Sequence, residues 1–107
     1  MHQKPQPTIP EKIRMPRGRE VFGLVVQLIG GARMIVQCKD GKERMCRVPG
    51  SIKKRVWVRE GDYVLVEPWS VDSDAKGDIA YRYVGAQVEE LKRKGLIQSN
   101  TGSVRTN

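Results

Sequence analysis

The sequence predicts an all-β protein, folded as a small barrel of five strands. Five short segments rich in β-branched residues alternate with turns formed by Gly, Pro and Asp. The longest gap separates the third segment from the fourth. The 107 residues allow one such domain with a tail at each end.

The first three strands follow one another through short turns. We predict strands over residues 21–30, 32–39 and 43–48, from their β-branched and apolar content. A Gly-Gly pair separates the first two strands, and Asp40-Gly41 separates the second from the third. Asp-Gly is typical of a two-residue hairpin turn, because both positions tolerate a positive φ.

The two cysteines lie on neighbouring strands of this hairpin. A two-residue turn at Asp40-Gly41 places Cys38 opposite Glu43, and Cys46 then falls on the other face of the sheet. That geometry excludes a disulfide between them. We expect both thiols to be reduced and to act as apolar filler, as in a reducing compartment.

The second half of the chain supplies two more strands and a helix. Ser51 is placed to cap a single helical turn over 52–55. Strands are predicted over 63–69 and 79–84, followed by a short helix over 85–95. Five strands with the longest gap between the third and fourth match an OB-fold barrel, although a meander closed in another way has a similar pattern.

The alternation of side chains predicts which aromatic residues are exposed. Trp69 shares a face with Glu67 and is the better candidate for exposure, whereas Trp57 lies between two valines and is predicted to be in the core. In the fifth strand, Tyr81 is predicted to share a face with Ile79.

The tails have a different composition from the middle of the chain. Residues 1–16 are rich in proline and poor in apolar groups, so we predict a flexible basic N-terminal tail. Residues 17–92 form the predicted OB-fold domain with its C-terminal helix, and residues 93–107 a flexible C-terminal tail.

Charge is unevenly distributed along the chain. Residues 20–59 carry nine basic and three acidic side chains, whereas residues 60–85 carry two basic and six acidic. This separation predicts a polyanionic partner on one side. Nucleic acid is favoured over an anionic membrane, because the basic region has strand and turn character and is not an amphipathic helix. Charge that only keeps a small protein soluble is the alternative.

The sequence argues against an enzyme, a metal protein or a membrane protein. The single histidine, His2, lies in the N-terminal tail, so the predicted domain has no histidine for general-base or zinc chemistry. We expect no cofactor. No apolar run is long enough to span a bilayer or to serve as a secretory signal, and we expect a cytoplasmic protein.

A basic cluster is the strongest candidate for a binding site. On a barrel, the second and third strands and the loop after them are neighbours, so their cations can converge on several phosphates. The cluster consists of Arg33, Lys42, Arg44, Arg47, Lys53, Lys54, Arg55 and Arg59, with Lys12, Arg14, Arg17 and Arg19 from the N-terminal arm. OB-fold faces commonly bind oligonucleotides.

The stretch "GKERMCRVPGSIKKRVWVREGDYVLV", which begins at Gly41, resembles translation initiation factor 1A, the archaeal and eukaryotic relative of bacterial initiation factor 1. The resemblance extends over residues 16–92. It implies an OB-fold barrel that binds the rRNA of the small ribosomal subunit at the decoding site, blocks premature tRNA entry, promotes subunit dissociation and stabilises initiator tRNA. It further implies indirect contact with initiator tRNA and other initiation factors, and a monomer.

The resemblance also points to particular residues. In this family the loop after the first strand and the basic face approach rRNA. The corresponding residues here are Gly31, Ala32, Arg33, Arg44, Arg47, Lys53, Lys54 and Arg55. Eukaryotic members carry a long acidic C-terminal tail, whereas residues 95–107 contain no acid; bacterial members lack the N-terminal arm and the final helix. The chain is therefore expected to be of archaeal type.

Two other interpretations remain open. A general RNA chaperone of OB type would bind many single strands with little preference. A docking subunit of a larger complex would use the basic rim to bind an acidic protein and would bind RNA weakly.

Overall fold

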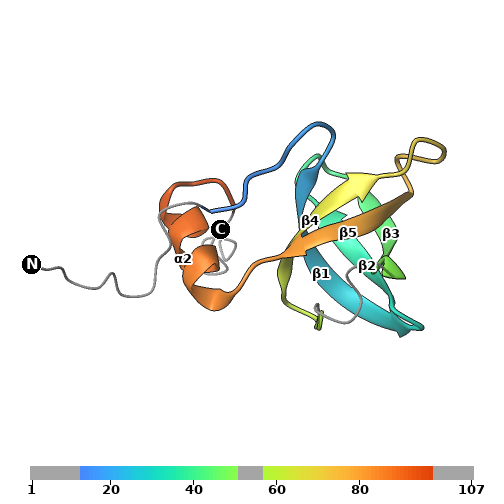
Figure 1. Ribbon diagram of the computed structural model, residues 1–107, viewed down its shortest axis with the longest axis horizontal. Helices are drawn as coiled ribbons and strands as arrows, with labels where there is room; N and C mark the ends of the chain where they lie inside the picture. The colour runs from blue at the N-terminus through green and yellow to red at the C-terminus, as the bar shows by residue number, and fades with distance from the viewer. Residues whose placement is uncertain (1–12, 51–56, 98–107) are drawn as a thin grey trace, which may run out of the picture. The chain divides into compact units, whose positions relative to one another are not determined.

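Five strands close into a barrel in the order β1-β2-β3-β5-β4 (Figure 1). The strands are β1 (Val21–Gly30), β2 (Arg33–Cys38), β3 (Glu43–Arg47), β4 (Tyr63–Pro68) and β5 (Lys76–Arg82). β3 and β5 are parallel, and the other neighbouring strands are antiparallel. This topology confirms the predicted five-stranded OB-fold barrel.

The computed structural model describes residues 13–50 and 57–97. Pro16–Tyr83 form one compact unit, and the helix α2 (Gly85–Arg93) belongs to a second. The helix ends near the predicted glycine: Gly95 has φ of 76°. The helical turn predicted over 52–55 lies outside the described residues, as does most of each predicted tail.

Strand β1 closes the barrel by pairing on both of its edges. Gly23 lies opposite Cys38 on β2 and opposite Val64 on β4. A Cβ atom on Gly23 would lie 2.4 Å from the Val36 Cγ1 atom, a distance that side chains do not tolerate. Glycine at this position therefore lets β1 cross close to β2.

The β2–β3 hairpin has a longer turn than predicted. The N–H of Gly41 donates to the Cys38 carbonyl at 3.0 Å, and the N–H of Cys38 donates to the Lys42 carbonyl at 2.9 Å. Gly41 has φ of 90°, so the loop is a type I turn followed by a glycine bulge. The predicted register is consequently wrong by one residue, and Gln37 is the partner of Glu43.

The shift in register changes the position of one cysteine. Cys46 lies opposite Met34, on the same face as Cys38, so the prediction of opposite faces is wrong. Both are free thiols buried in the core of the barrel. Burial raises the pKa of the Cys46 thiol to about 12.

Strand β5 begins at Lys76, three residues before the start of the strand predicted over 79–84. Residues 76–78 pair with residues 45–47 of β3, and this pairing provides hydrogen-bond partners for their backbone groups. A polar sequence pattern does not reveal such a pairing. The register shifts between Leu65 and Val66, so Ile79 and Tyr81 face opposite sides of the sheet. The prediction that they share a face is wrong because of this bulge.

Candidate nucleic-acid interface

A row of four charged side chains crosses the outer face of the barrel. Arg33 on β2 lies opposite Arg47 on β3, Arg47 opposite Asp78 on β5, and Asp78 opposite Glu67 on β4. Cross-strand partners share a face of the sheet, so the row runs from two cations to two anions.

The cationic half of the row brings two like charges together. Like charges directly opposite each other destabilise a sheet, and of these two cations only Arg47 has an ion-pair partner among the described residues, Asp78. Within residues 13–50 and 57–97, Arg33 is exposed and makes no ion pair. A phosphate group bound near the two side chains would offset the repulsion between them.

The turn before Arg33 has an unusual backbone. Gly31 and Ala32 have φ of 62° and 61°, and positive values are uncommon for alanine. The N–H of Val48 donates to the Ala32 carbonyl at 3.0 Å, so the end of β3 holds this turn. The Nε atom of Arg33 lies 4.0 Å from the position of a Cβ on Gly31, so the side chain folds back toward the turn.

A second row lies beside the charged one and is largely apolar. Ile35 on β2 is opposite Met45 on β3, and Met45 is opposite Lys76 on β5. The N–H of Trp69 donates to the Lys76 carbonyl at 3.0 Å, which continues the row beyond the end of β4. The outer face therefore presents apolar and aromatic groups next to cations, as surfaces that bind nucleic acids do.

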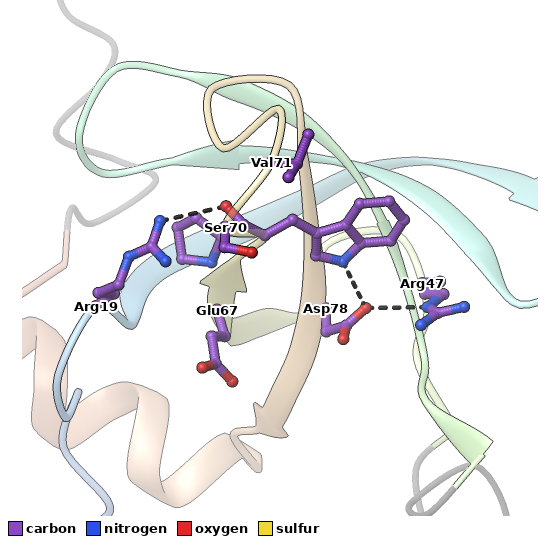
Figure 2. A pocket seen from close by; sticks show the side chains of 8 residues that line it. Arg19, Arg47, Glu67, Ser70, Val71 and Asp78 are labelled. Atoms are coloured by element: carbon purple, nitrogen blue, oxygen red, sulfur yellow. Dashed lines mark hydrogen bonds and ion pairs between the residues drawn. The ribbon is translucent and has the colours of Figure 1, made fainter.

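Trp69 and Arg47 border an open hollow of about 470 Å³, with Arg19 on its other side (Figure 2). Nη2 of Arg19 donates to the Trp69 carbonyl at 3.2 Å. Asp78 accepts hydrogen bonds from the indole of Trp69 and from Arg47. Trp69 is half-buried, and its indole N–H is engaged, so the prediction that it is the better exposed of the two tryptophans is wrong.

Trp57 is the exposed tryptophan. Its side chain is 75% exposed, so the prediction that it belongs to the core is wrong. The neighbouring Val58 packs against the core instead. Successive side chains on an extended chain point to opposite sides, so Trp57 and Val58 cannot both face inward. Assigning the inward position to Val58 would have identified Trp57 as exposed.

Arg44 is removed from the surface. It is 3% exposed, and its Nη1 and Nη2 donate to the two carboxylate oxygens of Asp40 at 3.1 and 3.0 Å. Its Nε donates to the Ser73 carbonyl. The guanidinium group lowers the pKa of Asp40 below its ordinary value, mainly through these hydrogen bonds. Arg44 therefore ties the β2–β3 turn to the β4–β5 loop, and its guanidinium group is buried, unlike those of the exposed cations Arg33 and Arg47.

The other predicted cations fall into three groups. Arg17 and Arg59 are exposed. Lys42 is half-exposed, and its Nζ lies 4.0 Å from an Asp74 carboxylate oxygen. Arg14 is likewise only partly exposed. Lys12, Lys53, Lys54 and Arg55 lie outside the described residues.

The structure also bears on metal and membrane sites. In the part of the chain that the structure describes, no three His, Cys, Asp or Glu side chains are grouped to hold a metal ion. Among the same residues, no helix has the length and apolar character needed to cross a membrane.

Comparison with known proteins identifies a family. The family model described as "Translation initiation factor 1A / IF-1" matches residues 10–105. The chain is 51% identical to translation initiation factor 1A of Pyrococcus abyssi over 86 residues, 80% of this chain and 76% of the relative. It is 46% identical to that of Methanococcus aeolicus over 101 residues, 92% and 96% of the two chains. Bacterial translation initiation factor 1 of a Wolbachia endosymbiont of Brugia malayi, in its solution structure, is 31% identical with a TM-score of 0.49, covering 67% of this chain and 84% of that one.

Proposed function

Since this chain belongs to the family of translation initiation factor 1A and its bacterial relative and acts in translation initiation, we propose that it binds the decoding site of the small ribosomal subunit. Proteins of this family are ribosome-binding factors and not enzymes. On this proposal the factor works by occupying a site, and no covalent bond is made or broken.

The observation that carries the proposal is the opposition of Arg33 and Arg47. The two arginines are cross-strand partners on the outer face of the sheet, beside a turn held by the end of β3. Because the closed barrel fixes the strands, the backbone positions of the two arginines are held in register before RNA arrives. Such preorganisation lowers the conformational cost of binding.

Trp57 adds a second kind of contact. Its ring is mostly exposed, and a base of unpaired RNA can stack on it with about 1–3 kcal/mol of favourable free energy. Arg59 is two residues away and also exposed, so a cation accompanies the ring. We include both with Arg17, Arg19, Lys42, Lys53, Lys54 and Arg55 in the proposed rRNA-binding surface.

The proposed consequences follow from occupancy. A protein seated in the decoding site excludes elongator tRNA from it, and so favours initiator tRNA in the neighbouring site. Its presence on the subunit face also promotes subunit dissociation. The factor would act as a monomer in the cytoplasm, and would affect initiator tRNA and other initiation factors indirectly.

Chemical footprinting tests the site. Small ribosomal subunits of Methanococcus aeolicus are probed with and without the protein at near-physiological salt. We expect a discrete set of protected nucleotides confined to the decoding site. Diffuse protection along the rRNA would instead indicate a general RNA chaperone, and absence of protection with tight binding to an acidic protein would indicate a docking subunit.

A charge reversal tests the observation itself. Arg33→Glu places a carboxylate opposite Arg47, so we expect a loss of subunit binding of at least tenfold, because one phosphate contact is lost and a repulsion is gained. Lys92→Glu, on α2, makes the same change in net charge and is the control. Equal losses in the two variants would show that only total charge matters, and would refute the role of the Arg33–Arg47 pair.

A further inference from the structure

We propose that Asp78 and Trp69 are positioning residues that hold the guanidinium group of Arg47 in one orientation for an RNA phosphate. This inference rests on the proposed function, because it assigns a role within the same RNA-binding surface. Neither Asp78 nor Trp69 has to touch RNA. Each acts through Arg47.

The geometry fixes the guanidinium group in two ways. The Oδ1 atom of Asp78 accepts a hydrogen bond from Nε of Arg47 at 3.1 Å (Figure 2). The guanidinium carbon of Arg47 also lies 5.3 Å from the centre of the Trp69 ring, within the range of a cation–π contact. One contact fixes the inner edge of the group, and the other fixes its distance from the ring.

The same carboxylate oxygen holds the ring. Nε1 of Trp69 donates to Oδ1 of Asp78 at 2.9 Å, so both donors share one acceptor. Arg19 donates to the Trp69 carbonyl, and the Nζ atom of Lys76 lies 5.7 Å from the centre of the indole ring. Trp69 is thus fixed at its backbone and at its indole, and it forms a rigid support for Arg47.

The remaining donors of Arg47 are available for a ligand. With Nε bound to Asp78, the Nη1 and Nη2 groups have no partner among the residues that the structure describes. The side chain is still 57% exposed. A planar guanidinium group with two free terminal nitrogens matches the geometry of a phosphate group.

An acidic residue in an RNA-binding surface gives a test in which the sign of the effect is decisive. By charge alone, removing the carboxylate of Asp78 reduces repulsion of phosphate and should tighten binding. If Asp78 positions Arg47, its removal should weaken binding instead. Glu67 is the matched control, because it is the cross-strand partner of Asp78 and borders the same hollow, but makes no ion pair among the described residues.

The experiment measures binding of the full chain to small ribosomal subunits of Methanococcus aeolicus. We expect Asp78→Asn to weaken binding roughly three- to tenfold, in the lower part of the range of coupling found for neighbouring groups in one network. We expect Glu67→Gln to leave binding unchanged or tighter. Binding by Asp78→Asn that is as tight as binding by Glu67→Gln would overturn the proposal.

A double-mutant cycle separates positioning from structural damage. In an Arg47→Ala background, Asp78→Asn should no longer weaken binding, because the group that it positions is absent. A loss of the same size in both backgrounds would overturn the proposal. Trp69→Phe keeps an aromatic ring but lacks the indole donor, so it provides a second variant if Asp78→Asn does not fold. It should also weaken binding only when Arg47 is present.

A measurement on the free protein distinguishes this inference from the proposed function. In nitrogen-15 NMR spectra, the Nε proton of Arg47 should exchange slowly with water in the wild-type protein and rapidly in Asp78→Asn. Rapid exchange in both would overturn the positioning role, whatever the subunit data show. Failure of the wild-type protein to bind subunits, with slow Nε exchange retained, would instead refute the proposed function.

Discussion

Replacing Asp40 by alanine tests the ion pair between Arg44 on β3 and the carboxylate of Asp40 in the β2–β3 turn. Arg44 is 3% exposed and donates to both carboxylate oxygens of Asp40. In Asp40→Ala the guanidinium group stays buried, with the Ser73 carbonyl as its remaining acceptor among these groups. Removing one partner of a buried ion pair costs about 3–5 kcal/mol. The Asp40 side chain is 34% exposed, so water can enter its place, and we expect the lower end, about 3 kcal/mol.

The free energy of unfolding is measured by urea titration, with far-ultraviolet circular dichroism as the signal that monitors unfolding. For a domain of this size, a loss of about 3 kcal/mol lowers the melting temperature by roughly 15 °C. Lys42→Ala is the control, because the Lys42–Asp74 pair is exposed and worth at most about 1 kcal/mol. The double variant Asp40→Ala/Arg44→Met should recover part of the loss, since no unpaired charge is then buried. Equal stability of Asp40→Ala and Lys42→Ala would refute the reasoning.

Four further predictions concern pH, packing, binding and reactivity. Because its hydrogen bonds to a buried arginine lower the pKa of Asp40 below 3.8, this carboxylate contributes stability above that pH and loses it as the pH falls further; urea titrations of Asp40→Asn should lack this acid-dependent component. Gly23→Ala should cost about 1–3 kcal/mol by overpacking against a valine methyl 2.4 Å away, and an unchanged urea midpoint would contradict the packing. Trp57→Ala should leave the melting temperature within a few degrees, yet weaken subunit binding about tenfold or more, whereas Trp57→Phe should retain most binding. Cys38 and Cys46 are buried, and the pKa of Cys46 is raised to about 12, so neither should react with a thiol reagent at pH 8 until urea unfolds the chain; rapid labelling of the native protein would contradict this.

The strands were predictable because their composition and turn residues act locally. The number of strands followed from the β-branched content, and the turn at Asp40-Gly41 followed from the chemistry of its residues. Turn length was not predictable, because Asp-Gly serves both a two-residue turn and a longer loop with a glycine bulge. The one additional residue in the observed turn decided which face of the sheet Cys46 occupies.

The candidate site was predictable in charge but not in geometry. The density of cations indicated a polyanionic partner, yet sequence alone did not reveal that Arg44 turns inward to Asp40 while Arg47 turns outward. Such choices depend on which acidic groups the fold brings near each cation. The pairing of β5 with β3 places Asp78 beside Arg47, although the two residues are far apart in the chain.

The pairing of β3 with β5 also has a consequence for folding. Hairpins such as β1–β2, β2–β3 and β4–β5 join strands that are adjacent in sequence, so they can form locally, whereas the parallel β3–β5 contact closes a long loop. Arg47 and Asp78 meet only when this loop closes. The orientation of Arg47 is therefore set only once the β3–β5 pairing forms, and a nascent or partly opened chain carries the cations of the proposed binding surface without their final arrangement.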